Sequence, residues 1–149
     1  MTINIPTDDL ENWLGELKPY QRSILNEFLT TQDAELAAEK WLTTTGSPNI
    51  VAFGGAENPK PFWDRFKNEF RRFLCDETAY AEEKKALVAE NPISKAMIIS
   101  VISSALGATL GLSATLIAPA ATLLLFTVGK MGLAAYCQAN VSSVPTETH

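Results

Sequence analysis

Residues 96–136 read AMIISVISSALGATLGLSATLIAPAATLLLFTVGKMGLAAY, and this stretch decides the fold. Between Lys95 and Lys130, 34 consecutive residues carry no charge. A membrane-spanning helix needs about 20 apolar residues, so the run is too long for a single span. The run contains Pro119, and proline is tolerated best at the first position of a helix. The sequence therefore predicts a helical hairpin that turns at Pro119.

The two predicted arms, at about 96–118 and 119–137, end in residues suited to a membrane interface. Lys130 lies about 9 Å from the end of the second arm at a rise of about 1.5 Å per residue. A lysine side chain can extend over that distance to reach the interface. We expect Lys95, Lys130 and Tyr136 to be interfacial residues, since aromatic and basic side chains gather at membrane boundaries.

Small residues recur along the first arm. Ser103, Gly107 and Gly111 are spaced four residues apart, and the two glycines form a GxxxG pattern. Small residues on one face let helices approach closely, which drives helix packing in lipid. The pattern has two interpretations. It can serve contact between the two arms of one hairpin, or it can serve self-association into a homo-oligomer.

Charge divides the chain into unequal parts. Up to Lys95 there are 11 Lys and Arg residues and 16 Asp and Glu residues, whereas the rest of the chain contains one Lys and one Glu. The sequence predicts an all-α protein with a small, soluble, acidic helical domain at 1–92. An apolar helical hairpin at 93–138 follows, and 139–149 is expected to be a disordered tail.

Cap and stop residues mark several helices in the first part. Thr7 is expected to cap a helix whose first turn is acidic, and Pro19 is expected to interrupt the helical run. A strongly amphipathic helix is predicted at Pro61–Cys75, and Asp76 is expected to cap the helix after it. Ser94 is expected to cap the first arm of the hairpin.

The predicted amphipathic helix is locally basic although the domain is acidic. Residues 60–72 carry five positive and two negative charges. Its phenylalanines at helical spacing predict a buried aromatic face opposite a solvated basic face. The alternative is that Arg65, Lys67, Arg71 and Arg72 dock on anionic lipid or on a partner protein. The overall acidic charge argues against nucleic-acid binding.

The sequence offers little for catalysis. Its one histidine is His149, so a histidine-based catalytic or metal site is not expected. No cofactor is expected either. Cys75 and Cys137 are interpreted as two thiols in a reducing compartment, with a single disulfide as the alternative.

These observations favour a non-catalytic, membrane-associated protein. We expect an effector or toxin-like protein whose hairpin oligomerises and perturbs a bilayer, controlled by an N-terminal domain that binds an unidentified protein. The excess of Lys and Arg before the hairpin places that domain in the cytoplasm. The alternative is a soluble cytoplasmic interaction or adaptor module whose hairpin is buried in its own core or in an oligomer.

Overall fold

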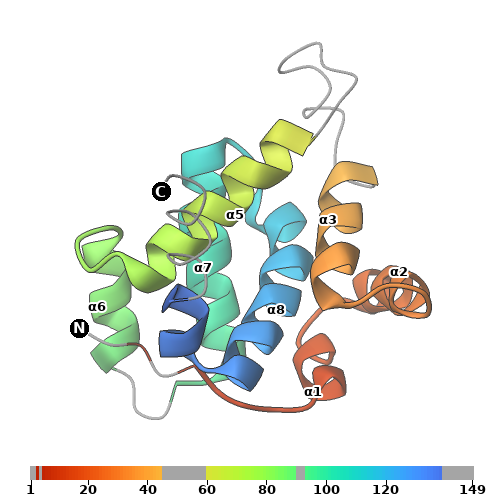
Figure 1. Ribbon diagram of the computed structural model, residues 1–149, viewed down its shortest axis with the longest axis horizontal. Coiled ribbons are helices and arrows are strands. Elements are labelled where there is room, and N and C mark those ends of the chain that lie inside the picture. The colour runs from red at the N-terminus through yellow and green to blue at the C-terminus, as the bar shows by residue number, and fades with distance from the viewer. Residues whose placement is uncertain (1–2, 4, 45–59, 90–92, 139–149) are drawn as a thin grey trace, which may run out of the picture.

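The structure is a computed structural model that describes residues 3, 5–44, 60–89 and 93–138. Every element of the described residues is a helix, which confirms the predicted all-α class (Figure 1). The helices are α1 (Leu10–Leu14), α2 (Pro19–Leu29), α3 (Ala34–Thr44), α5 (Lys60–Cys75), α6 (Ala81–Ala89), α7 (Lys95–Leu110) and α8 (Ala114–Met131). The predicted disordered tail lies outside the described residues.

Helices α7 and α8 form the predicted hairpin and lie side by side at the centre of the fold (Figure 1). Ser94 caps α7 as expected, because its Oγ accepts the N–H of Met97 at 3.0 Å. Ser113 caps α8 in the same way and accepts the N–H of Leu116 at 3.3 Å. Each cap satisfies one backbone donor that a helix start leaves without a partner.

The predicted position of the turn is wrong. The chain reverses at Gly111–Ser113, and Pro119 is the sixth residue of α8. Gly111 adopts the left-handed conformation, with φ of 80°, which glycine reaches at little cost. The Gly107 carbonyl accepts the N–H groups of Gly111 and Leu112 at 2.8 and 2.9 Å, so the turn closes directly over Gly107.

Pro119 is tolerated within α8 because a neighbouring helix supplies the one hydrogen-bond donor that the proline lacks. A proline cannot donate to the carbonyl four residues earlier, which here belongs to Thr115. Gln21 of α2 donates its Nε2 to that carbonyl at 3.1 Å. The next carbonyl, on Leu116, accepts the indole Nε1 of Trp41 in α3 at 2.8 Å. The proline therefore joins α8 to two of the helices around it.

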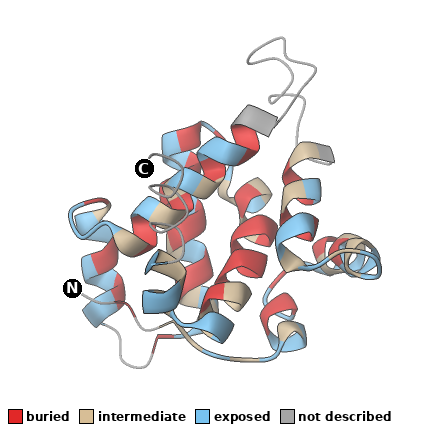
Figure 2. Cartoon of the chain, in the orientation of Figure 1, coloured by how far each residue is buried: buried red, intermediate tan, exposed pale blue. Residues whose placement is uncertain are grey.

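The hairpin and the surrounding helices share one hydrophobic core (Figure 2). Helix α3 packs on α8, and α5 runs across α7 (Figure 1). The aromatic face of α5 is buried. The largest fully buried side chains come from both parts of the chain: Trp13, Trp63, Phe66, Phe70, Phe73, Leu25, Leu42, Leu87, Ile98, Ile102, Leu106 and Ile117. Other helices of the chain therefore cover much of the hairpin.

Of the described helices, α8 alone is long and apolar enough to cross a membrane, and half of its 18 residues are buried inside the protein. Helix α7 is apolar too but has 16 residues. Length and composition do not separate a membrane span from the core helix of a soluble protein. The fold therefore identifies a candidate span without assigning a location.

The tight turn over Gly107 gives a stability prediction. A Cβ atom at position 107 would lie 2.5 Å from the Leu112 carbonyl oxygen, which is too close for any side chain. We expect Gly107→Ala to lower the free energy of unfolding by about 1–3 kcal/mol because the turn must shift. Urea unfolding followed by circular dichroism measures this value.

Gly15→Ala is the matched control. Gly15 has helical dihedral angles, and a Cβ there would meet its nearest atoms at an ordinary 3.5 Å. Alanine at such a position stabilises by about 0.4–1 kcal/mol, since it restricts the unfolded chain. Equal unfolding free energies for the two variants would contradict the described turn.

Candidate functional site

The hairpin has two chemically different ends. Its base contains Lys95, the first residue of α7, and Lys130, the penultimate residue of α8. Its tip, Gly111–Ser113, is uncharged, and both Gly111 and Ser113 are exposed. Because α7 and α8 run in opposite directions, both lysines lie at the base and none lies near the tip.

The N-terminal segment, residues 5–9, crosses the hairpin base. Thr7 does not cap α1 as expected, and its Oγ1 instead donates to the Gly129 carbonyl at 3.0 Å. Gly129 allows this approach, since a Cβ there would lie 2.5 Å from the Pro6 carbonyl oxygen. Lys95 Nζ donates to Asp8 Oδ2 at 2.8 Å. The segment is thus bound to both arms of the hairpin.

The Asp8 carboxylate is stabilised in its charged form. Hydrogen bonds from Asn12 and Lys95 lower its pKa to about 2. A carboxylate with a depressed pKa stabilises the folded state above its unfolded pKa, and this contribution is lost as the pH falls through the folded value. The link between Asp8 and Lys95 therefore persists in mildly acidic solution.

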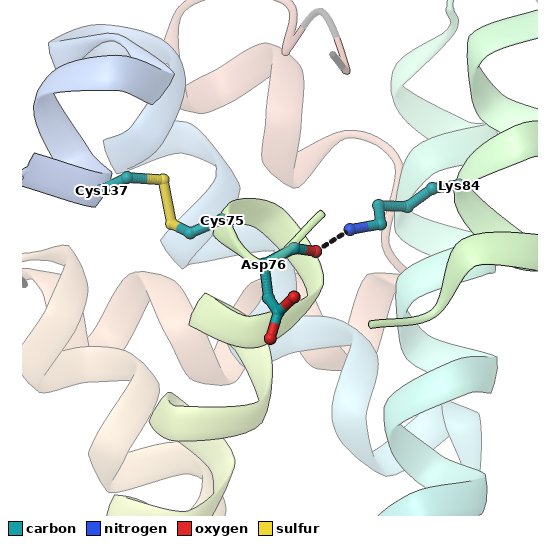
Figure 3. The surroundings of a disulfide bond; sticks show 4 residues. All are labelled: Cys75, Asp76, Lys84 and Cys137. Atoms are coloured by element: carbon teal, nitrogen blue, oxygen red, sulfur yellow. Dashed lines mark hydrogen bonds between the residues drawn. A yellow bond between two sulfur atoms is a disulfide. The ribbon is translucent and has the colours of Figure 1, made fainter. Parts of the chain in front are cut away.

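Cys75 and Cys137 form a disulfide, so the prediction of two thiols is wrong (Figure 3). Cys75 is the last residue of α5, and Cys137 lies six residues beyond α8. Gly132, with φ of 95°, ends α8, and residues 133–138 form a further helical turn. The ring of Tyr136 in this turn packs edge-on against Phe70 of α5, with centroids 6.2 Å apart. The bridge therefore joins the hairpin base to α5.

A buried lysine that sequence reasoning missed lies beside this bridge. Lys84 of α6 is 2% exposed, and its ammonium donates to the carbonyl of Asp76, the residue after Cys75 (Figure 3). Burial lowers the pKa of Lys84. Lys84 lies three residues before the buried Leu87, so both residues are on one face of the helix. This spacing in the sequence could have predicted that Lys84 is buried.

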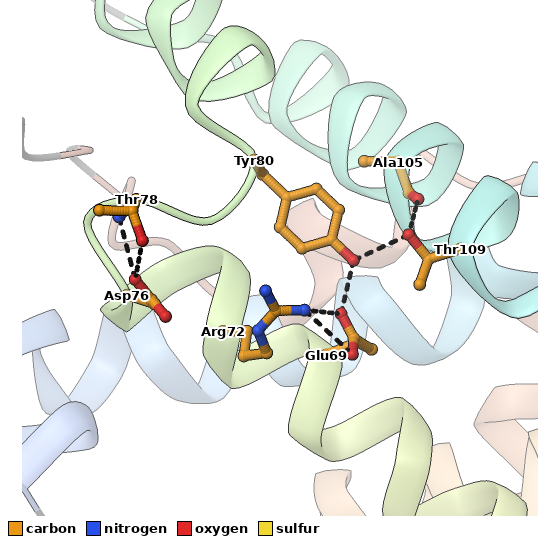
Figure 4. Close-up of polar contacts among 7 residues, drawn as sticks. All are labelled: Glu69, Arg72, Asp76, Thr78, Tyr80, Ala105 and Thr109. Carbon is orange, nitrogen blue, oxygen red and sulfur yellow. Dashed lines mark hydrogen bonds and ion pairs between the residues drawn. The ribbon is translucent and has the colours of Figure 1, made fainter.

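A second polar cluster connects α5 and Tyr80, the residue before α6, to α7 (Figure 4). Tyr80 Oη lies 2.6 Å from Glu69 Oε1 and 2.9 Å from Thr109 Oγ1. Arg72 Nη1 pairs with Glu69 at 3.0 Å. Burial and the Glu69 carboxylate raise the pKa of Tyr80, so its hydroxyl keeps its proton. The predicted cap Asp76 instead accepts the N–H and hydroxyl of Thr78 at 2.9 Å, ahead of α6.

The basic face of α5 is partly neutralised by neighbouring acids. Lys67 pairs with Glu35 of α3 at 3.3 Å, and Arg72 pairs with Glu69. Arg65 is exposed and Arg71 is half-buried. The aromatic side of the helix is buried as expected. Docking of the basic residues on lipid or on a partner stays a prediction.

The small-residue pattern is largely inside the protein. Ser103 and Gly107 are buried, whereas Gly111 forms the exposed turn. The Ser103 Oγ has no hydrogen-bond partner among the described residues. These positions support close packing within the hairpin, and the predicted homo-oligomer would require the hairpin to leave its present surroundings.

The other two predicted interfacial residues differ in exposure. Lys130 is exposed, and its ammonium lies 5.6 Å from the centroid of the Phe126 ring. Tyr136 is half-buried against α5. Among the described residues, no group of three or more His, Cys, Asp or Glu side chains could hold a metal ion.

Comparison of the chain with protein-family models, curated proteins and solved structures gives no match. The function proposed for this chain therefore rests on the hairpin, its uncharged tip and the contacts at its base.

The hydrogen bond from Gln21 to Thr115 predicts a coupling with Pro119. We expect Gln21→Met to cost about 0.5–1.5 kcal/mol, because it removes the donor to the part-buried Thr115 carbonyl. Pro119→Ala restores the backbone N–H that bonds this carbonyl, so Gln21→Met should cost less in that background. Urea unfolding of the two single variants and the double variant measures the difference. An equal cost in both backgrounds would show that Gln21 does not compensate for the proline.

The low pKa of Asp8 predicts a pH dependence. Wild type should be more stable than Asp8→Asn at neutral pH because Asp8 pairs with Lys95. This advantage should stay constant down to about pH 4 and then vanish as the pH falls through about 2. Unfolding free energies of both proteins between pH 7 and pH 2 test the trend. An advantage that disappears near pH 5 would contradict the depressed pKa.

Proposed function

We propose that this protein is a non-catalytic, membrane-active protein that stores an apolar hairpin in its core and inserts it, tip first, into a lipid bilayer. The distribution of charge along the hairpin carries this proposal. Lys95 and Lys130 lie at the base, and the exposed tip at Gly111–Ser113 has no charge to move through hydrocarbon.

The lengths of the two arms support insertion. At about 1.5 Å per residue, the 16 residues of α7 and the 18 residues of α8 extend about 24 and 27 Å. The hydrocarbon core of a bilayer is about 30 Å thick, so the tip would reach the far leaflet. The lysine side chains would extend to the near interface.

Two polar side chains of α8 already have partners within their own helix. Thr122 and Thr127 donate to the Ala118 and Leu123 carbonyls of their own helix at 2.8 and 3.1 Å. Such bonds remain when a helix moves into hydrocarbon, where every polar group needs an internal partner. The Thr115 carbonyl, which accepts Gln21, would need a new partner, and it lies one turn from the tip.

Helices α1, α2, α3, α5 and α6 surround the hairpin and are called the cover. These covering helices would control release of the hairpin. A pocket of about 270 Å³ separates the chain around Leu17 and Gln21 from Ser103 of α7 and Thr115 of α8. Packing is therefore incomplete where the cover meets both arms of the hairpin, since Ala96 near the base of α7 also lines this pocket. Released hairpins could then self-associate through Ser103 and Gly107, and the cover would bind a partner or anionic lipid, as an effector or toxin-like protein requires.

Two features favour different sides for insertion. The excess of Lys and Arg before the hairpin favours a cytoplasmic position for the covering helices. The Cys75–Cys137 disulfide is typical of an oxidising compartment. In either case the covering helices stay on the side from which the tip enters.

The second candidate is a soluble helical interaction module whose hairpin is its permanent core. The burial of half of α8 favours it, because a core helix of a soluble protein is buried in this way. Such a protein stays in the supernatant when it is centrifuged with vesicles.

A pair of cap substitutions tests the proposal. Ser113 at the tip and Ser94 at the base are both exposed N-caps, and aspartate caps a helix as well as serine does. Both Ser113→Asp and Ser94→Asp should therefore fold. Only Ser113→Asp adds a charge that must cross hydrocarbon, so it should slow dye release from phosphatidylcholine–phosphatidylglycerol vesicles about tenfold or more.

Ser94→Asp should release dye at nearly the wild-type rate because its charge stays at the base. Equal rates for the two variants would mean that the tip does not cross the bilayer. Wild-type protein, both oxidised and reduced, should be tested with these vesicles. If it releases no dye and remains in the supernatant, the protein is not membrane-active and the soluble interaction module is the better assignment.

A further inference from the structure

The Cys75–Cys137 bridge encloses the whole hairpin. The two cysteines are 62 positions apart, and the loop between them contains α6, α7 and α8. Cys75 lies at the end of α5, and Cys137 lies in the turn after α8. The bridge is therefore a covalent link between a helix that covers the hairpin and the base of the hairpin itself (Figure 3).

Helix α5 must separate from α7 before the hairpin can leave the core. Phe66, Phe70 and Phe73 of α5 are fully buried, and α5 packs against α7. With the bridge intact, the end of α5 cannot move away from the hairpin base. The aromatic face then stays near the apolar surface that it covers, and separated helices close again rapidly because the link keeps their effective concentration high.

Noncovalent contacts at the same end of α5 are weaker than the bridge. Tyr136 packs on Phe70, and Lys84 donates to the Asp76 carbonyl. These contacts hold α5 in the described arrangement but break and reform on their own. Among the described contacts between α5 and the hairpin base, the disulfide is the one covalent bond, and reduction breaks it.

We infer that the Cys75–Cys137 disulfide is a redox lock on the hairpin: the oxidised protein keeps the hairpin covered, and reduction permits its release to a lipid bilayer. This inference rests on the proposed function, because it assigns the control of that same hairpin.

The reductant is a dithiol. Its thiolate attacks one sulfur of the bridge, which breaks the S–S bond and releases the other cysteine as a thiolate that takes up a proton. The second thiol of the reductant then cleaves the mixed disulfide. The protein gains two electrons and two protons, and the dithiol becomes a disulfide. Both cysteines are half-buried rather than enclosed, so a small dithiol can reach them.

Dye release tests the lock with the full chain. Oxidised wild type, wild type reduced with dithiothreitol, and the Cys75→Ser/Cys137→Ser variant are each added to phosphatidylcholine–phosphatidylglycerol vesicles. We expect the reduced protein and the double variant to release dye about tenfold faster or more than the oxidised protein, because the covered state opens more often. Dithiothreitol should not change the rate of the double variant.

Leu25→Ala is the control for a general loss of stability that leaves the disulfide intact. Leu25 is fully buried in α2, which packs on α3, so its truncation lowers stability without touching the bridge. Oxidised Leu25→Ala should release dye more slowly than the double cysteine variant, because its bridge still joins α5 to the hairpin base. If it matches the double cysteine variant, or if oxidised and reduced wild type both release dye and do so equally fast, the lock is overturned.

Trypsin cleavage in the absence of lipid tests the lock independently of the proposed function. Helix α5 contains trypsin sites at Arg65, Lys67, Arg71 and Arg72, which are cleaved only when the helix opens. Reduction should speed this cleavage if the bridge holds α5 in place. Faster cleavage without dye release would support the lock and contradict membrane insertion. Unchanged cleavage after reduction would overturn the lock regardless of the vesicle result.

Discussion

The structure depends on removing one uncharged stretch, the 34 residues between Lys95 and Lys130, from water. Two helices that are apolar on nearly every side cannot be covered by each other alone. The chain supplies the remaining cover with the aromatic face of α5 and with α3, whose Ala37 and Ala38 allow a close approach. The same apolar surface that stabilises this core is the surface that a bilayer would accept.

Polar contacts decide how firmly the cover is attached. In the first turn of α8, Gln21 donates to the Thr115 carbonyl that Pro119 leaves without its regular partner, and Trp41 donates to the adjacent Leu116 carbonyl. At the base, Lys95 pairs with Asp8 and the disulfide joins Cys75 to Cys137. The hydrogen bonds satisfy backbone carbonyls of α8, and the ion pair and the disulfide join other segments to the hairpin base. Release of the hairpin therefore requires several local changes rather than the loss of a single contact.

Local signals in the sequence predicted the existence of the hairpin, the amphipathic helix α5 and the Ser94 cap, since each depends on neighbouring residues. Pro119 was misinterpreted as the turn, because the donors from Gln21 and Trp41 come from distant parts of the chain. A local signal for the true turn was present in the glycine at 111 and the cap serine two residues later. The pairing of Cys75 with Cys137 depends on how the chain continues after α8, which no local pattern specifies. The function of the hairpin stays a prediction.

The central claim is that the hairpin exchanges its protein cover for lipid. Hydrogen exchange of the reduced full chain, with and without phosphatidylcholine–phosphatidylglycerol vesicles, tests this exchange most directly. The account predicts that amides of α8 stay protected on vesicles while those of α3 lose protection, because an 11-residue helix is marginal without the packing that α8 provides. If the amides of both helices exchange identically with and without vesicles, the hairpin has not left the core and the account is contradicted.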